Sequence, residues 1–173
     1  MRSATQEAAQ LLKEHGITAP PVPVEEIAQR LGIVVIRSKA DPQESGFLLR
    51  DGQTAIIGVN EANAHVRQRF TVAHELGHFR LHKGKQLIVD KSVVINKRDA
   101  TSSLATDDEE IAANQFAAAL LMPRPMVRDA ASCHLEMGVN SRDDLIAALV
   151  NEFDVSPEAM GYRLTNLGII RSY

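Results

Sequence analysis

The chain has 173 residues, 45% of them hydrophobic, and a formal net charge of −3. This length is typical of one globular domain, and the acidic balance lacks the basic excess of most nucleic-acid-binding proteins. The single cysteine, Cys133, excludes an internal disulfide. The N-terminus has no apolar signal core and no apolar run is long enough to cross a bilayer, so we expect a cytoplasmic protein.

Hydrophobic spacing and turn signals divide the chain into short helices and strands. In chain order, we expect helices over 4–15 and 24–31, strands over 33–37, 47–49 and 54–59, and helices over 63–82, 109–122, 124–132, 142–152 and 157–167. Within residues 85–106 the runs LIVD and VVIN could be strands, and the following stretch has the composition of an exposed loop. Asp107 and Asp108 are the expected caps of a helix that Pro123 ends.

These elements predict an α+β fold with a small, mostly antiparallel three-stranded sheet. The Asp51-Gly52 pair is typical of a hairpin turn between the last two strands. The strand over 55–59 is either an ordinary core strand or an open edge to which a peptide could add. We expect a single domain over 1–173, with a helical N-terminal part (1–32), the sheet and two central helices (33–123), and a helical C-terminal part (124–173).

The segment His74-Glu75-Leu76-Gly77-His78 lies inside the helix expected over 63–82. Histidines four residues apart project from one face of a helix, about one turn apart, which suits two positions of a tetrahedral zinc ion. Glu75 points about 100° further round the helix, so it can act as general base on a water without being a ligand. Gly77 would let another element approach closely. The apolar residues that can pack on the core are Val72, Leu76 and Phe79.

A catalytic zinc ion needs a third protein ligand. Glu110 and Asn114 lie one turn apart on the helix expected over 109–122, so one face carries a carboxylate and an amide. Glu110 could bind zinc, and Asn114 could bond to the second nitrogen of a histidine and orient it. Glu109 stays open as an alternative to Glu110, and both could simply favour a helix N-terminus.

Two longer segments contain these residues, RFTVAHELGH (69–78) and EIAANQFAAALLMP (110–123). Together they resemble the ImmA/IrrE metallopeptidase family. The segments PPVPVEEIAQRLG (20–32) and FDVSPEAMGYRLTNLG (153–168) are similar to the opening and the close of the same family. The resemblance therefore covers nearly the whole chain.

The resemblance implies a zinc-dependent peptidase, with His74, His78 and Glu110 as zinc ligands and Glu75 as general base. It also implies a substrate, since members of this family typically cleave helix-turn-helix transcriptional repressors and relieve repression in mobile-element, stress-response or toxin–antitoxin contexts. The expected partner is a protein, without direct nucleic-acid binding and without a membrane. The sequence leaves the oligomeric state open.

Two other functions fit parts of the sequence. Residues 145–164 also match a helix-turn-helix unit in which Ser156 and Pro157 start the second helix, so the chain could be a DNA-binding regulator. That helix carries one basic residue, Arg163, whereas phosphate contacts dominate DNA affinity. Alternatively, zinc could stabilise a non-catalytic module that sequesters a repressor.

Five further residues lie outside the predicted site. His82, one turn beyond the second histidine of the motif, could be an extra ligand or a transition-state donor, but we expect it to face solvent. Cys133 is expected to act as a small hydrophobic residue, and His65 is given no role. His134 and Tyr162 could stabilise an oxyanion, but nothing in the sequence places either near the zinc.

Overall fold

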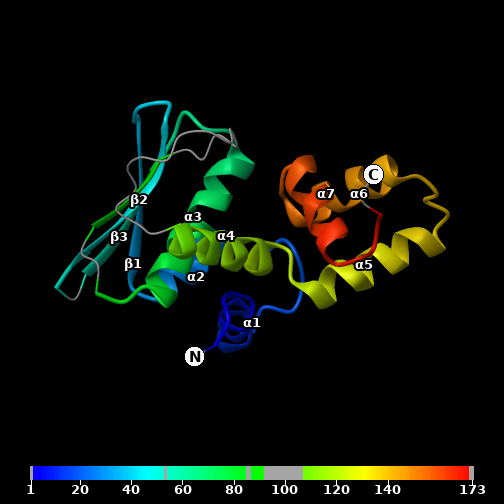
Figure 1. Cartoon of the computed structure of the whole chain (residues 1–173), viewed down its shortest axis with the longest axis horizontal. Helices are drawn as coiled ribbons and strands as arrows, with labels where there is room; N and C mark the ends of the chain where they lie inside the picture. Colours follow the sequence, from blue (N-terminus) through cyan, green and yellow to red (C-terminus); the bar gives the residue numbers. More distant parts are fainter. Residues whose placement is uncertain (1, 53, 85–86, 92–106, 172–173) are drawn as a thin grey trace.

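The sheet, two central helices and a C-terminal helical unit follow one another along the longest axis of the molecule (Figure 1). The computed structural model describes residues 2–52, 54–84, 87–91 and 107–171. Its helices are α1 (Ala4–Glu14), α2 (Val24–Arg30), α3 (His65–Leu81), α4 (Asp107–Leu121), α5 (Arg124–Glu136), α6 (Arg142–Phe153) and α7 (Pro157–Asn166). Its strands are β1 (Ile33–Ser38), β2 (Glu44–Asp51), β3 (Thr54–Asn60) and β4 (Leu87–Lys91).

The described sheet has four strands in the order β1-β3-β2-β4. β2 pairs antiparallel with β3 and with β4, whereas β1 pairs parallel with β3. The α+β class is confirmed, but the prediction of three strands is wrong because the LIVD run forms β4. Hydrophobic periodicity alone cannot assign an apolar run of this length. The VVIN run lies outside the described residues.

β3 lies inside the sheet, between β1 and β2. Its side chains at Ala55, Ile57 and Val59 are buried, so the open-edge alternative for residues 55–59 is wrong. The expected hairpin joins β2 to β3, and Gly52 has the positive φ of 59° that such a turn favours. The order of the strands along the chain could not predict that β3 would insert between β1 and β2.

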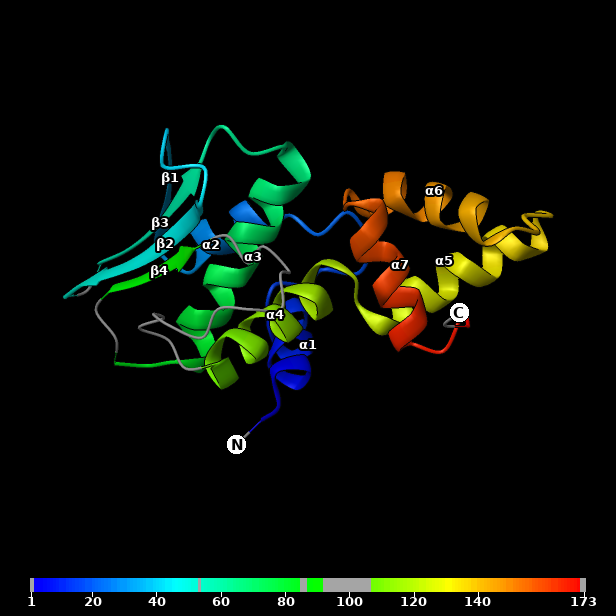
Figure 2. The same cartoon turned by 45° about the horizontal axis from the view of Figure 1, so that its top comes forward.

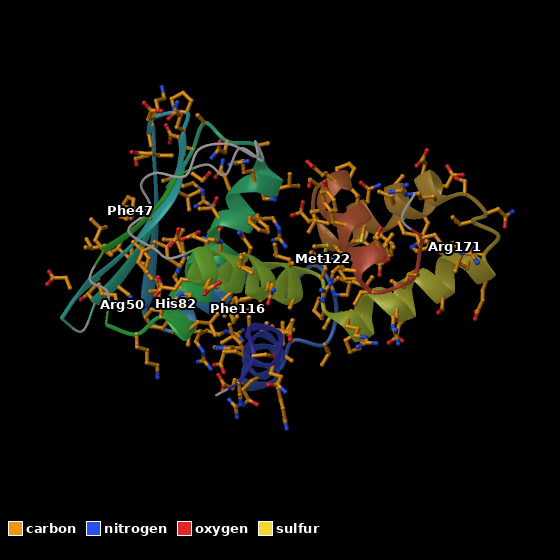
Figure 3. All side chains as sticks on the ribbon, viewed as in Figure 1. Phe47, Arg50, His82, Phe116, Met122 and Arg171 are labelled. Atoms are coloured by element: carbon orange, nitrogen blue, oxygen red, sulfur yellow. The ribbon has the colours of Figure 1, made fainter. Side chains whose placement is uncertain are left out.

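The two central helices meet at an unusually short distance. α3 packs against β2 and β3, α4 packs against α3, and α1 covers α4 (Figures 1 and 2). A Cβ atom added at Gly77 would lie 3.2 Å from the Cα of Ala113 and 3.1 Å from Cδ1 of Phe116, which lies at this contact (Figure 3). The expectation that Gly77 permits a close approach is confirmed. Val72 and Leu76 are fully buried, as the apolar face predicts.

The C-terminal helices α5, α6 and α7 form a separate group beyond the end of α4 (Figures 1 and 2). Arg69 of α3 connects them to the rest of the fold. Its guanidinium donates to the backbone carbonyls of Asp154, at 3.1 Å, and of Val22, at 3.0 Å. It also forms an ion pair with the Asp154 carboxylate. One largely buried arginine, with 11% of its side chain exposed, thus joins the central helix to the α6–α7 corner and the N-terminal connector.

Every helix expected from the sequence is present in the described residues, with small shifts at the ends. α4 begins at Asp107, so Asp107 and Asp108 lie in its first turn. α5 continues to Glu136 rather than stopping at 132. None of the described helices is long and apolar enough to cross a membrane.

Substituting Gly77→Ala should lower the free energy of unfolding by about 1–2 kcal/mol, because the new methyl group meets the backbone of Ala113, which cannot move aside cheaply. Gly161→Ala in α7 is the matched control. There the nearest atom is 3.6 Å away, so the better helix propensity of alanine should raise stability by up to about 1 kcal/mol. Urea denaturation of both variants measures the difference, and equal effects would show that the α3–α4 contact is not constrained.

Candidate metal centre

α3 carries His74, Glu75 and His78 on its buried side. Their exposed fractions are 2%, 0% and 0%. These polar side chains are buried because α3 is enclosed by the sheet on one side and by α4 on the other. Burying polar groups is costly unless they are paired, so this arrangement indicates a site and not only a core helix.

The structure brings His74, His78 and Glu110 together. The two Nε2 atoms of the histidines lie 3.0 Å apart. Glu110 Oε2 is 3.3 Å from Nε2 of His74, and Glu110 Oε1 is 3.3 Å from Nε2 of His78. Among the described residues these three form a possible metal site, and the cluster contains Glu110 rather than Glu109.

The other nitrogen of each histidine also has a partner. His74 Nδ1 donates to Oδ1 of Asn114 at 3.0 Å, which is the contact that the spacing of Glu110 and Asn114 suggests. His78 Nδ1 lies 2.9 Å from Nδ1 of His82. The expectation that His82 faces solvent is wrong, since it is half-buried and bonds to a cluster residue. The sequence signal for this contact is the spacing of four residues between His78 and His82, which places both on one face of the helix.

Two charged groups set the electrostatics of the centre. Burial alone would raise the pKa of the Glu110 carboxyl, but hydrogen bonds and positive charge from His74 and His78 outweigh burial and hold that pKa well below its usual range. Burial lowers the pKa of the Arg50 guanidinium, whereas the negative charge of Glu75 raises it. Arg50 therefore lies close enough to Glu75 to interact with its charge, and it donates to the His78 carbonyl at 2.9 Å.

These donor atoms fit a divalent metal ion. In a tetrahedral zinc site, bonds of about 2.0–2.1 Å place neighbouring donor atoms about 3.3 Å apart. The observed separations of 3.0 to 3.3 Å match this value. When His74 is neutral and donates its Nδ1 proton to Asn114, the lone pair of its Nε2 atom points at His78 and Glu110. Such an arrangement is repulsive unless a proton or a cation lies between the donors.

The remaining candidates from the sequence lie elsewhere. His65 pairs with Asp154, at 2.8 Å, and His134 pairs with Glu152, at 3.1 Å. Cys133 is exposed on α5. Tyr162 of α7 is 60% exposed and lines a cavity between α3, α4 and α7.

A family model described as the IrrE N-terminal-like domain, a peptidase family, matches residues 28–165. The chain belongs to this family. The match confirms the resemblance to ImmA/IrrE proteins and supports a metallopeptidase-type function. The matched region contains the cluster of His74, His78 and Glu110 together with Asn114 and His82. A search of the curated proteins found no match.

We predict that His82→Ala weakens metal binding by about 10- to 100-fold, because metal ligation through Nε2 leaves the His78 Nδ1 proton to be held by His82. Competition with a chromophoric chelator measures the affinity. His65→Ala is the control, since this side chain is 70% exposed and pairs with Asp154. Equal affinities for the two variants would exclude an orienting role for His82.

Proposed function

We propose that the protein is a zinc-dependent endopeptidase that cleaves a helix-turn-helix transcriptional repressor and so relieves repression. The convergence of His74, His78 and Glu110 on one point, with a buried glutamate adjacent to the first histidine in sequence, carries the proposal. Two imidazoles and a carboxylate make up the ligand set of many hydrolytic zinc enzymes and leave one position for water or substrate.

A bound zinc ion would supply a Lewis acid that polarises the scissile carbonyl and lowers the pKa of the attacking water. Glu75 would accept a proton from that water and later deliver it to the departing amine nitrogen, which returns the carboxylate to its starting state. The Arg50 guanidinium lies close enough to Glu75 for their opposite charges to attract each other. Asn114 and His82 would hold the two imidazoles in the orientation that ligation requires.

The substrate class rests on family membership and on the resemblance of the whole chain to ImmA/IrrE proteins. His74, Glu75 and His78 are buried between the sheet and α4, so the substrate would be a polypeptide segment that is presented locally unfolded. The biological setting that we propose is a mobile-element, stress-response or toxin–antitoxin system, in which loss of one repressor switches a set of genes. Within it, the endopeptidase would act on a single regulatory protein.

The two alternatives fit the structure less well. The one basic residue of the candidate recognition helix, Arg163, donates Nε to the backbone carbonyl of Met122 at 2.9 Å and serves the fold. A non-catalytic module that only sequesters a repressor would have no need for a buried carboxylate adjacent in sequence to a metal ligand. Glu75 has an exposed fraction of 0%, and retaining an ionisable group there is costly without a chemical role.

Metal analysis tests the ligand set. Purified protein should hold about one zinc ion per chain. His74→Ala and Glu110→Ala should each lower the zinc affinity by at least about 100-fold, because each removes a direct ligand. Glu109→Ala is the matched control and should retain the ion, since Glu109 is not in the cluster. Unchanged zinc in the Glu110 variant would contradict the proposed site.

Glu75→Gln separates catalysis from binding. The variant should keep its zinc and its thermal stability but lose about 10²- to 10⁴-fold in hydrolysis, because an amide cannot accept the proton of water. Zinc-loaded wild-type and variant proteins can be incubated with an extract of the cells that make the protein, followed by labelling of newly formed N-termini. We expect a repressor fragment with the wild type alone. Identical fragments from both proteins would show that Glu75 is not the base.

A further inference from the structure

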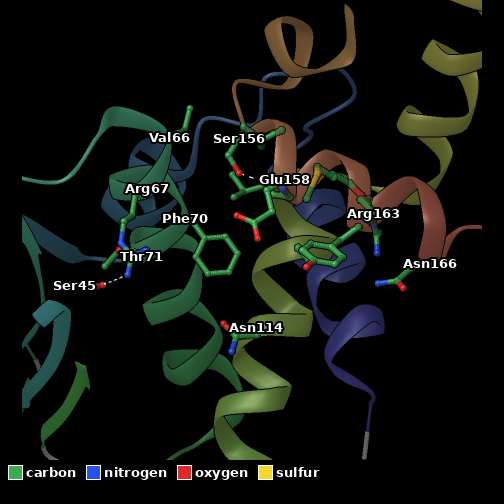
Figure 4. A pocket seen from close by; sticks show the side chains of 16 residues that line it. Ser45, Val66, Arg67, Phe70, Thr71, Asn114, Ser156, Glu158, Arg163 and Asn166 are labelled. Carbon is green, nitrogen blue, oxygen red and sulfur yellow. Dashed lines mark hydrogen bonds between the residues drawn. The ribbon is translucent and has the colours of Figure 1, made fainter. Parts of the chain in front are cut away.

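A cleft of about 590 Å³ lies between α3, α4 and α7. Figure 4 shows its two sides, with Phe70 on α3 facing Glu158 and Arg163 on α7. Asn114 of α4 lies at one end of it (Figure 4). Cavities of about 300–1,000 Å³ are the size at which proteins bind small molecules or a few residues of a peptide.

The cleft adjoins the metal centre through two side chains. Asn114 lines the cleft and at the same time accepts the hydrogen bond from His74 Nδ1. Phe70 lines it one helical turn before His74, and the centroids of the two rings are 6.3 Å apart. A polypeptide whose scissile peptide bond lies at the metal centre could therefore place the side chain of a neighbouring residue in the cleft.

The walls of the cleft are mainly apolar. The apolar residues are Val66, Phe70, Ala118, Leu121, Met122, Val155 and Ala159. The two arginines that line the cleft already have partners in the fold. Arg67 donates to Ser45 Oγ at 2.8 Å, and Arg163 donates to the Met122 carbonyl at 2.9 Å. An apolar side chain entering here would leave water without having to displace either of these contacts.

We propose that this cleft is a substrate subsite that takes a large apolar side chain, such as Leu, Ile, Met or Phe, close to the bond that is cleaved. The proposal rests on the proposed function, because it assigns a role to the surroundings of the same metal centre. It also gives α7 a function, since the C-terminal helical unit supplies the wall opposite α3.

The selectivity of the cleft can be measured without knowing the natural substrate. Zinc-loaded wild-type protein is incubated with a library of peptides prepared from a denatured proteome, and cleavage sites are read by mass spectrometry with Glu75→Gln as the blank. We expect large apolar residues to be enriched by about 10-fold or more at one position within a few residues of the cleaved bond.

Ala118→Leu tests whether the cleft produces this preference. Ala118 is half-buried in α4 and lines the cleft, so a leucine there fills part of the space. We expect the preference to shift to small residues while the zinc content stays unchanged. Ala147→Leu is the matched control, since Ala147 is exposed on α6 and lies outside the cleft, and it should cleave like the wild type.

A second measurement does not depend on cleavage. In zinc-loaded Glu75→Gln protein labelled at its alanine methyl groups, the Ala118 resonance should shift when a preferred peptide is added. The same peptide with aspartate in place of the apolar residue should cause a shift at least about 10-fold smaller at equal concentration. The Ala147 methyl group should not respond to either peptide.

The possible outcomes separate the two proposals. Cleavage that depends on Glu75 but shows no apolar preference, or the same preference in Ala118→Leu and the wild type, would overturn the subsite and leave the peptidase function intact. A zinc-loaded wild-type protein that cleaves no peptide and shows no methyl shift would overturn both. Both proposals are supported if the wild type and Ala147→Leu prefer large apolar residues at the cleavage site and Ala118→Leu does not.

Discussion

The metal centre depends on the close contact between α3 and α4. Gly77 has no side chain, so the backbone of Ala113 can approach α3 to a distance at which an added Cβ would be 3.2 Å away. Glu110 lies one turn before this contact, and its carboxylate reaches both imidazoles at 3.3 Å. Metal–ligand bonds tolerate deviations of about 0.2 Å. A side chain that pushed the helices apart by more than this would leave the carboxylate out of reach.

The close packing of α3 and α4 buries polar side chains, and the surrounding residues offset the free-energy cost of this burial. His74, Glu75 and His78 are almost completely buried, and polar groups in such positions destabilise a fold unless they are paired. Asn114 and His82 satisfy the outer nitrogens of the imidazoles, and the charge of Glu110 faces their inner nitrogens. The contacts that stabilise the buried polar residues are therefore also the contacts that orient them toward a metal ion.

The sequence predicted the helices and the shared face of His74 and His78 well because both depend on local spacing. The two histidines and Glu75 follow from the helical period, and Gly77 marks the close contact. The pairing of β1 with β3, and with it the interior position of β3 in the sheet, could not be predicted, since hydrophobic alternation does not identify a strand's partner. His82 was misassigned because helical spacing places it near His78 but does not indicate whether the end of α3 is covered. The apolar cleft combines residues of four separate elements, so no local pattern could indicate it.

Rigid helices, rather than loops, set the distance between the metal centre and the cleft. α3 carries Phe70 and His74 one turn apart, and α4 carries Asn114 and Ala118 one turn apart. The opposite wall, α7, is tied to this pair of helices through Arg69 at the α6–α7 corner and through the Arg163 contact with Met122. Sites built on packed helices hold their geometry more closely than sites built on loops. In the function proposed here, the two central helices would thus determine both where the bond is cleaved and which neighbouring side chain is selected.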